Sequence, residues 1–459
     1  MKKIVVFGAT SLLLPVVYSQ DRPNVIYVFA DQWRAQETGY SGSENVSTPN
    51  VDSFAKQSLN FTTAVSCCPV SGAYRASLLT GTYPLTHGVF YNDKEINRNL
   101  TSVGEAFKNA GYATAYIGKW HVDGHGRDAF IPKERHMGFD YWKVRECTHD
   151  YNHSFYYENT PDTLYWEGYD AFAQTHDAIG YLQNADRNKP FVLFLSWGPP
   201  HNPYQTAPKK FREKFNDTSK IRLRGNVPKE YEVKAKRDIA GYYAHIEALD
   251  ECLGILLESI KKEGLEENSV VIFTSDHGDM LYSHGLTDKQ KPWDESILVP
   301  FLLRYPEKFG KDQRLIRTPF RSPDIMPSLL SLCGVKIPET VEGTSQASYW
   351  EKGTVSKDSV ALITSYVPFH NWNYKKGGRE YRGIRTPGYT YVRDLKGPWL
   401  LYNNQVDPLQ MHNLVNQEGM EELQFHLEKL LQNELEKRND AFLPGDKYMK
   451  MWNYDFDEN

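Results

Sequence analysis

Residues 270–279 read VVIFTSDHGD, an apolar run of β-branched and aromatic residues that ends in two acidic residues and a histidine. The apolar residues occupy consecutive positions, which is typical of a strand buried on both faces of a sheet. Working outward from this stretch, similar runs occur at residues 25–30, 114–120, 191–197 and 300–304. A sheet covered by helices on both sides would bury all of them.

Helical patterns separate these runs, at residues 102–110, 169–184, 238–262 and 322–333. The first opens on a capping box of Ser102 and Glu105. The last is expected to begin with Ser322 as its cap and Pro323 at its first helical position. Alternating strands and helices predict an α/β fold with a large, mostly parallel central sheet flanked by helices.

The pattern changes after about Gly353, where short aromatic strand patterns follow at residues 381–385, 389–393 and 399–402. A final amphipathic stretch covers residues 419–437. We therefore expect a smaller C-terminal antiparallel sheet with a helix packed on it. The predicted division is a signal segment at 1–19, a main domain at 20–353 and a C-terminal subdomain at 354–459.

The N-terminus resembles a secretory signal, with Lys2 and Lys3, an apolar run at residues 4–17, and small or polar residues up to Ser19, after which we expect cleavage. The run is shorter than the roughly 20 residues that span a membrane. We therefore expect no membrane span, and a periplasmic or secreted protein.

The charge and the cysteines narrow the possible partners and compartments. A net charge of −5 makes nucleic acid an unexpected partner, because proteins that bind it normally carry a basic excess. The five cysteines have irregular spacing that matches no zinc-site pattern. Export would permit a disulfide among them, with at least one thiol left over.

Polar residues follow the ends of the first predicted strand and of the 270–276 strand. Asp31 and Gln32 follow the predicted strand at residues 25–30. Asp276 is the last residue of the predicted strand at 270–276, and His277 follows it. Ligands of open α/β sheets bind at the carboxyl ends of strands, so these residues together suggest a cation site. Taken alone, Asp31 could equally be a loop carboxylate that caps a helix. Asp279 is the nearest competing ligand.

Two more strands end in residues that could transfer protons or bind anions. Lys119 and His121 are two positions apart, which in a strand places both side chains on one side. His201 lies in the stretch PPHNP, whose prolines would hold it stiffly. Lys289, four residues before Trp293, is a further candidate cation, with Lys291 as its competitor.

Residues 71–81 read SGAYRASLLTG, and from Ala76 onward they have a helical pattern. Ser71 would then lie at or just before a helix N-terminus, where free amides and the helix dipole favour an anion. A serine there is most often only an N-cap, and Arg75 could be a surface charge.

Together and in this order, these segments resemble the type I, formylglycine-dependent sulfatases of the alkaline phosphatase superfamily. The usual family pattern is C-x-P-S-R-x-x-L-L-T-G, and its first residue is oxidised to formylglycine. Ser71 stands at that position, with Ala73 and Tyr74 in place of proline and serine. The resemblance implies a serine-type, anaerobic maturase as a partner. It extends from Pro23-Asn24 to Asp407-Pro408, and so covers most of the chain.

The resemblance also implies a role for each candidate residue. One divalent cation, usually Ca²⁺, would be held by Asp31, Gln32, Ser71, Asp276 and His277. Sulfate would be bound by Lys119, His201 and Lys289. Arg75 and His121 would orient the formylglycine.

Hydrated formylglycine would attack sulfur while His201 protonates the leaving oxygen. His121 would then remove a proton from the second hydroxyl, so that sulfate leaves and the aldehyde returns.

Two positions depart from the common family pattern. Gln32 stands where many members have aspartate, and His277 where many have asparagine, so manganese or zinc remain alternatives to calcium. Relatives that hydrolyse phosphonate monoesters or phosphodiesters carry similar variants, which makes such an activity the alternative. A third hypothesis is an unmodified, inactive protein that binds sulfated ligands.

Export, a chain rich in Tyr and Trp, and a second subdomain fit a sulfated carbohydrate substrate such as a glycosaminoglycan or mucin-type glycan, because aromatic faces stack on sugar rings. Large aromatic residues are equally often core. The sugar, the sulfate position and exo or endo action stay open. Candidate sugar-binding residues are Arg34, His125, Arg127, His149, Trp197, Asn202 and the loop at 369–379.

Overall fold

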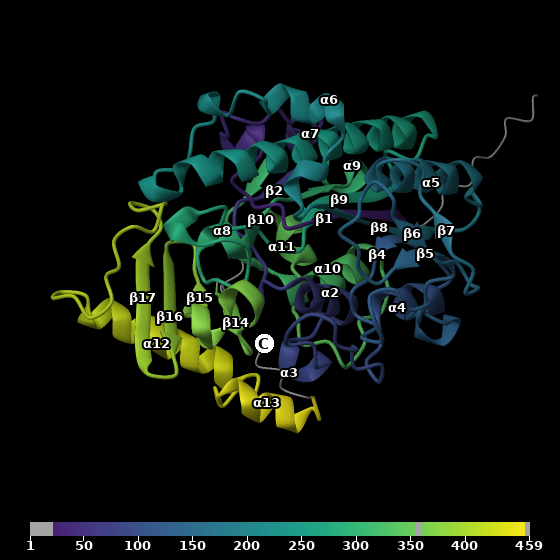
Figure 1. Ribbon diagram of the computed structural model, residues 1–459. Helices are drawn as coiled ribbons and strands as arrows, with labels where there is room; N and C mark the ends of the chain where they lie inside the picture. The colour runs from purple at the N-terminus through teal and green to yellow at the C-terminus, as the bar shows by residue number, and fades with distance from the viewer. Residues whose placement is uncertain (1–21, 355–359, 455–459) are drawn as a thin grey trace, which may run out of the picture.

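A central sheet with strand order β12-β2-β11-β9-β1-β8-β4-β5 runs through the middle of the protein (Figure 1). The computed structural model describes residues 22–354 and 360–454, so the predicted signal segment lies outside the described residues. The five strands from β9 to β5 are parallel, and β11 is antiparallel to β9. The predicted large, mostly parallel sheet is confirmed. Its strands are β1 (Asn24–Asp31), β2 (Leu59–Phe61), β4 (Ala113–Lys119), β5 (Tyr141–Arg145), β8 (Phe191–Pro200), β9 (Ser269–Ser275), β11 (Phe301–Arg304) and β12 (Arg314–Ile316).

Helices cover both faces of this sheet, as the consecutive apolar residues of its strands require. Ile26 and Val28 of β1 pack on one side, in a core shared with α1 (Pro49–Ala55), α5 (Asp170–Asn184) and α7 (Glu232–Lys262). Tyr27 and Phe29 face the other side, toward α2 (Ser71–Thr80), α4 (Val103–Asn109) and α10 (Ile325–Leu332). The strand ends are therefore held rigidly between two layers.

The predicted helices are present, with two corrections at their N-termini. The capping box of Ser102 and Glu105 is confirmed at the start of α4. The expected cap at Ser322 is wrong, because its hydroxyl accepts a hydrogen bond from the backbone of Cys67 instead. A short 3-10 turn (Ser322–Asp324) precedes α10, with Arg321 in the N-cap position. Helix α7 begins at Glu232, earlier than predicted.

The C-terminal part forms a four-stranded antiparallel sheet of order β14-β15-β16-β17, visible beside the main body in Figure 1. The strands are β14 (Ala361–Ser365), β15 (Tyr381–Arg385), β16 (Tyr389–Asp394) and β17 (Gly397–Asn403). Helix α12 (Glu421–Glu436) packs its leucines on one face, which confirms the expected sheet and helix. The other face contacts Met280, Trp293 and Ile297 of the main body. The domain boundary near Gly353 stays a prediction.

Shorter elements complete the described chain. A three-stranded sheet joins β10, β3 and β13, and a two-stranded ribbon joins β6 and β7. These elements are β3 (Ala64–Val65), β6 (Phe155–Tyr156), β7 (Leu164–Tyr165), β10 (Leu298–Val299), β13 (Phe320–Arg321), α3 (Pro84–His87), α6 (Lys209–Arg212), α8 (Asp294–Ile297), α9 (Pro306–Phe309), α11 (Ala347–Lys352) and α13 (Gly445–Met451).

The predicted export raised two questions, whether a disulfide forms and whether a helix spans a membrane. All five cysteines fall within the described residues, and each is buried and free, so the disulfide that export would permit is not formed. Among the described helices, none combines the length and the apolar character needed to cross a bilayer.

Candidate active site

The parallel strands bring the candidate residues to one edge of the central sheet. Asp31 is the last residue of β1, and Asp276 follows the end of its neighbour β9. On the other side of β1, β8 ends just before His201, and β4 ends at Lys119. Residues far apart in the chain therefore meet, because parallel strands share their carboxyl edge.

Asp31, Asp276 and His277 form a buried cluster whose ligand atoms lie within 4.8 Å of one another. His277 Nδ1 lies 2.9 Å from the Gly278 carbonyl, to which it can only donate. Its Nε2 is then left as a lone pair that faces the cluster, and burial lowers the pKa of His277 to about 4. Two carboxylates and a neutral imidazole fit a divalent cation.

Gln32 contacts this cluster through its backbone, whose N–H donates to Asp276 Oδ1 at 3.0 Å. Its Nε2 donates to Asp279 Oδ2 at 2.7 Å, and its Oε1 accepts from Lys289 Nζ at 3.2 Å. Asp279, the competing ligand in the sequence, is itself fully buried and also accepts from the Leu281 amide at 2.9 Å. It holds the Gln32 amide and lies outside the three-residue cluster.

Ser71 is the first residue of α2, and the N-cap position belongs to Val70, so the N-cap interpretation of Ser71 is wrong. Its Oγ lies 3.2 and 3.1 Å from the two carboxylate oxygens of Asp31 and 2.9 Å from His277 Nε2. The side chain has no exposed surface. The hydroxyl is therefore directed into the acidic cluster.

Arg75, one helical turn after Ser71, is buried and so is not a surface charge. Its Nη2 lies 3.5 Å from Asp31 and 3.3 Å from Asp276, while Nη1 donates to the Lys119 carbonyl at 2.8 Å. Lys119 Nζ lies 2.5 Å from Asp31 Oδ2. Burial opposes the ionisation of Asp31, but the positive charge of Lys119 and further cations hold its pKa well below its usual range.

His121 lies beyond the end of β4 with φ of 63°, so a turn, and not strand geometry, directs its side chain. Its Nε2 lies 3.3 Å from Asp93 Oδ1, and Arg127 holds the same carboxylate at 3.0 and 2.8 Å. The other ring nitrogen, Nδ1, is buried without a hydrogen-bond partner among the described residues. Burial and the charge of Lys119 lower the pKa of His121 to about 3, so the ring is neutral and can accept a proton.

His201 and Lys289 are joined by a hydrogen bond. Lys289 Nζ donates to His201 Nε2 at 2.9 Å, and His201 Nδ1 donates to the Asn202 carbonyl at 2.9 Å. His149 stacks on the His201 ring at 4.7 Å. Burial, with the charge of Lys289, lowers the pKa of His201, and burial lowers that of Lys289. Lys291, the competitor, instead donates to the Thr287 carbonyl.

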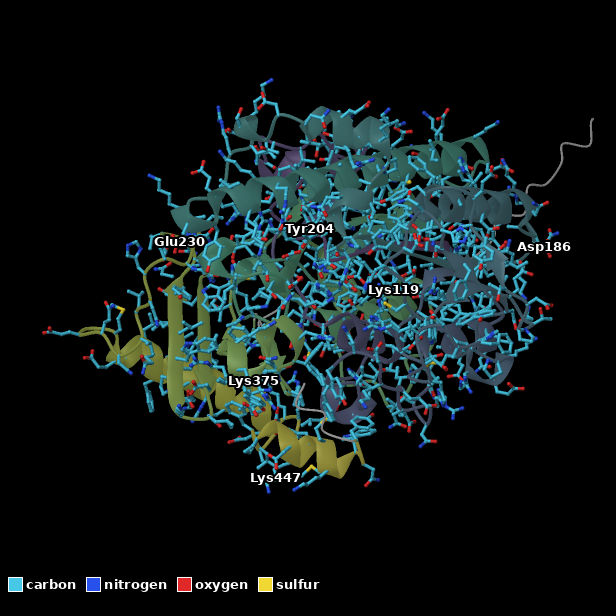
Figure 2. The ribbon with its side chains drawn as sticks, viewed as in Figure 1. Lys119, Asp186, Tyr204, Glu230, Lys375 and Lys447 are labelled. Carbon is cyan, nitrogen blue, oxygen red and sulfur yellow. The ribbon has the colours of Figure 1, made fainter. Side chains whose placement is uncertain are left out.

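A cavity of about 440 Å³ opens above these groups, and Lys119 lies near the centre of the molecule in Figure 2. Strand-end residues supply its floor, and the loop after β14 supplies much of its wall. It is lined by Asn92, Lys119, His121, Arg127, His149, His201, Asn202, Asp288, Lys289, Gln290, Phe369, His370, Asn371, Asn373 and Lys376.

Some candidate sugar-binding residues lie elsewhere. Arg34 is buried against Glu37, and Trp197 belongs to the hydrophobic core, so neither can contact a substrate in the cavity. His125 pairs with Asp123, and Arg379 with Asp394, outside the lining.

Sequence reasoning missed Asn92, Asp93, Asp288 and Gln290, which come from irregular segments. The only local signal among them was the position of Asp288 and Gln290 on either side of Lys289.

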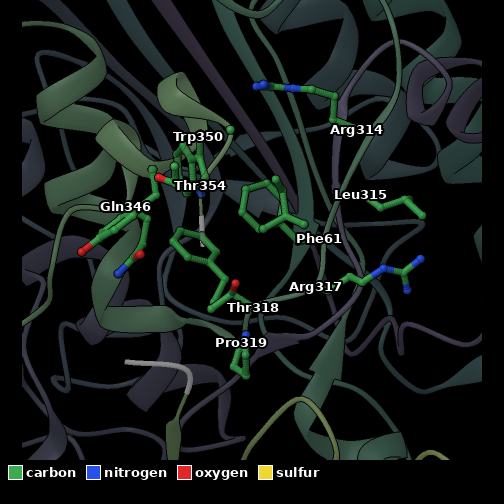
Figure 3. A pocket seen from close by; sticks show the side chains of 13 residues that line it. Phe61, Arg314, Leu315, Arg317, Thr318, Pro319, Gln346, Trp350 and Thr354 are labelled. Atoms are coloured by element: carbon green, nitrogen blue, oxygen red, sulfur yellow. The ribbon is translucent and has the colours of Figure 1, made fainter. Parts of the chain in front are cut away.

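A smaller cavity of about 170 Å³ lies between β12, β13 and α11 (Figure 3). Phe61, Arg314 and Trp350 are among its lining residues. It contains none of the candidate residues, so the chemistry belongs to the larger cavity.

Comparison with known proteins places this geometry in a family. The model of the family described as Sulfatase matches residues 23–335, more than half of the chain. The chain belongs to the sulfatase family. The C-terminal part of this sulfatase, residues 282–437, also matches the model described as N-sulphoglucosamine sulphohydrolase, C-terminal. It is thus a hydrolase of sulfuric esters.

Individual relatives agree with the family. The sulfatase is 42% identical over 445 residues to an ulvan-active sulfatase of Formosa agariphila, covering 95% of this chain and 86% of that one. It is 31% identical over 492 residues to an endo-4-O-sulfatase of Bacteroides thetaiotaomicron, covering 92% and 94%.

Solved structures share the fold of the sulfatase. One from work on the metabolism of multiple glycosaminoglycans by Bacteroides thetaiotaomicron has a TM-score of 0.84 at 29% identity, covering 94% and 99% of the two chains. The phosphonate monoester hydrolase of Agrobacterium radiobacter, at 21% identity and a TM-score of 0.73 over 91% and 96% of the chains, shows likeness of fold alone.

Proposed function

We propose that this sulfatase removes a sulfate ester from a carbohydrate, with formylglycine made from Ser71 and a divalent cation, Ca²⁺ first among the candidates. The observation that carries the proposal is the Ser71 hydroxyl, held within 3.2 Å of Asp31 and His277. Asp31 in turn pairs with Lys119, one of the cations that line the cavity. Relatives named as ulvan-active and endo-4-O-sulfatases support a sulfated glycan as the substrate class.

The cation would be held by Asp31, Asp276, His277 and the amide oxygen of Gln32. When bound, the cation and the formylglycine would supply, respectively, positive charge for a sulfate oxygen and the nucleophile. Arg75 and Lys119 neutralise the two carboxylates, which lets them lie side by side although both are buried. Lys119 and Lys289, at the cavity floor, provide positive charge for the remaining sulfate oxygens.

His201 is placed to protonate the leaving oxygen. Its Nδ1–H is fixed on the Asn202 carbonyl, so Nε2 is the ring atom that exchanges protons. Lys289 Nζ donates to that atom at 2.9 Å, so Lys289 would give up its proton to Nε2, which would then give a proton to the leaving oxygen. The leaving alkoxide of a sugar needs such a proton, because an alcohol is a poor leaving group without one.

His121 is placed to accept a proton in the release of sulfate. Asp93 accepts the Nε2–H, which leaves the buried Nδ1 with its lone pair. The low pKa keeps this atom free of a proton at neutral pH. The two histidines therefore take opposite roles, one as acid and one as base.

The test uses the mature chain produced in an anaerobic bacterium that contains a serine-type maturase. Mass spectrometry of the Ser71 peptide should show loss of two hydrogen atoms, and the protein should release sulfate from sulfated glycan fragments. EDTA should abolish release and Ca²⁺ should restore it. Ser71→Ala should lose roughly 10⁴-fold or more in kcat.

Ser77→Ala is the matched control, because Ser77 is also buried in α2 but contacts His87 instead of the acidic cluster. It should retain activity. Faster hydrolysis of a phosphodiester or phosphonate with the same leaving group would contradict the proposal. An unconverted Ser71 peptide with tight binding of sulfated glycan and no turnover would contradict it in favour of a binding protein.

A further inference from the structure

One wall of the active-site cavity comes from residues 369–376, between β14 and β15 of the C-terminal sheet. The side chain of Gln290 fixes this wall by two reciprocal hydrogen bonds with the backbone of Phe369, Nε2 to the carbonyl at 3.1 Å and Oε1 from the amide at 3.2 Å. Gln290 directly follows Lys289. The wall is therefore tied to the floor beside a catalytic candidate.

A row of polar side chains runs from the floor to this wall. Asp288 accepts from Asn202 Nδ2 at 3.2 Å and from Asn371 Nδ2 at 2.5 Å, one bond to each carboxylate oxygen. The other end of the Asn371 amide, Oδ1, accepts from Lys376 Nζ at 2.8 Å. All four residues line the cavity. The row thus places the Lys376 ammonium at a fixed point of the cavity mouth.

The cationic side chains of the cavity differ in whether a carboxylate pairs with them. Lys119 pairs with Asp31, and Arg127 pairs with Asp93. Lys289 lies at the floor between Gln32 and His201, in the place proposed for the sulfate that is removed. Lys376 is exposed, and its hydrogen-bond partner in the row is a neutral amide; no carboxylate of the described residues pairs with it.

We propose that Lys376 binds a second anionic group of the glycan, a carboxylate or another sulfate, so that the preferred substrate is a polyanionic glycan. This inference rests on the proposed function. Lys376 lies at the mouth and Lys289 at the floor, so the group it binds is separate from the sulfate that is removed. Asp288 and Asn371 act as positioning residues for the ammonium.

The test compares three oligosaccharides that share one sulfated sugar, with a neighbouring sugar that is neutral, carries a carboxylate, or carries a second sulfate. The wild-type protein should show kcat/KM roughly three- to tenfold higher for one or both anionic partners, the range expected for an exposed ion pair. The better of the two identifies the group. Lys376→Gln should remove the preference through KM with kcat unchanged, and Lys376→Arg should keep it.

Lys375→Gln is the matched control. Lys375 is the neighbouring exposed lysine on the same 3-10 turn, does not line the cavity, and lies toward the C-terminal sheet in Figure 2. Equal effects of Lys375→Gln and Lys376→Gln would overturn the inference, because they would indicate general attraction by surface charge. Equal kcat/KM of the wild type on all three oligosaccharides would overturn it as well.

Calorimetric binding of the same three oligosaccharides to protein with unconverted Ser71 separates the two levels of proposal. Binding that depends on Lys376, without turnover by converted protein, would contradict the proposed function but would still show that Lys376 binds an anionic group of the glycan. Turnover by converted protein without dependence on Lys376 would do the opposite.

Discussion

In each histidine of the proposed site, a hydrogen bond holds one ring nitrogen, and the other nitrogen is the one proposed to bind the cation or transfer a proton. His277 and His201 each donate Nδ1–H to a backbone carbonyl, and His121 contacts the Asp93 carboxylate through Nε2. In the proposed function, His277 and His201 would therefore act through Nε2, and His121 would act through Nδ1. Such fixed tautomers let neighbouring histidines take different roles within one cavity.

Asp93→Asn tests whether Asp93 positions His121. The Asp93 carboxylate raises the pKa of His121 against burial and Lys119, which together bring it to about 3. Without that charge the imidazole is a weaker base, so kcat should fall roughly 10- to 100-fold with little change in KM. The acid limb of the kcat–pH profile should move to lower pH, because protonation of His121 then requires more acid.

Asp128→Asn is the control for this change, since Asp128 is an exposed carboxylate that pairs with Arg145. It should leave both kcat and the profile unchanged. A fall in kcat/KM of Asp93→Asn that comes from KM alone would show that Asp93 serves substrate binding instead.

The residues that the sequence could identify are those at strand ends. Asp31 and Lys119 end buried strands, and His201 and Asp276 directly follow them. The topology of a parallel sheet predicts that these residues meet. Asp93 and Asp279 could not be assigned their roles, because their contacts depend on loops whose paths no periodicity describes. The sequence suggested that Arg34 could contact a substrate, but Arg34 forms a buried ion pair with Glu37, three residues later in the chain.

At the scale of elements, Glu146 fastens the turn after β4 to the end of β5. Its Oε1 accepts from the amides of Asp123 at 2.8 Å and Gly124 at 3.0 Å, two and three residues after His121. The other oxygen is buried without a partner among the described residues. Burial raises the pKa of this carboxyl to about 7.

This pKa predicts a dependence of stability on pH. Because the folded-state pKa lies above the unfolded value of 4.5, the contribution of Glu146 is fully present below pH 4.5 and is lost as the pH rises through about 7. The loss should amount to about 3 kcal/mol. In Glu146→Gln the free energy of unfolding should therefore fall less than in the wild type between pH 5 and pH 8, measured by urea denaturation.

Glu134→Gln, at an exposed glutamate of a nearby 3-10 turn, should follow the wild type at both pH values. Equal losses of stability by Glu146→Gln and the wild type between the two pH values would contradict this prediction, because Glu146 would then be ionised at both.

Helices and strands could be predicted from the sequence where the apolar residues follow one clear spacing. The buried strands and the helices at 169–184 and 419–437 follow from it, and α5 and α12 match these ranges to within two residues. Strand β14 was missed because its five residues, ALITS, lack the aromatic pattern of its neighbours. Helix α13 was missed because seven residues after a proline give little period to detect.

At the scale of the molecule, a buried ion pair joins the C-terminal sheet to the main body. Arg385 of β15 holds both carboxylate oxygens of Asp294 in α8, at 3.0 and 3.1 Å. Removing one partner leaves the other charge buried and unpaired. Arg385→Ala should therefore lower the free energy of unfolding by about 3 kcal/mol in chemical denaturation.

Arg393→Ala is the matched control on the same sheet, because Arg393 forms a partly exposed pair with Glu428 of α12. Its cost should stay below about 1 kcal/mol. Similar costs for the two variants would mean that the Arg385 pair does not join the two parts.

The burial of Ser71 also has a consequence for when Ser71 could be oxidised relative to folding. Its side chain has no exposed surface once α2 packs against the sheet, and the groups that complete the cavity extend to Lys376, far along the chain. A separate enzyme that oxidises Ser71 needs this segment open and accessible. Any conversion must therefore precede folding, and the chain would acquire its nucleophile before it has a pocket in which to use it.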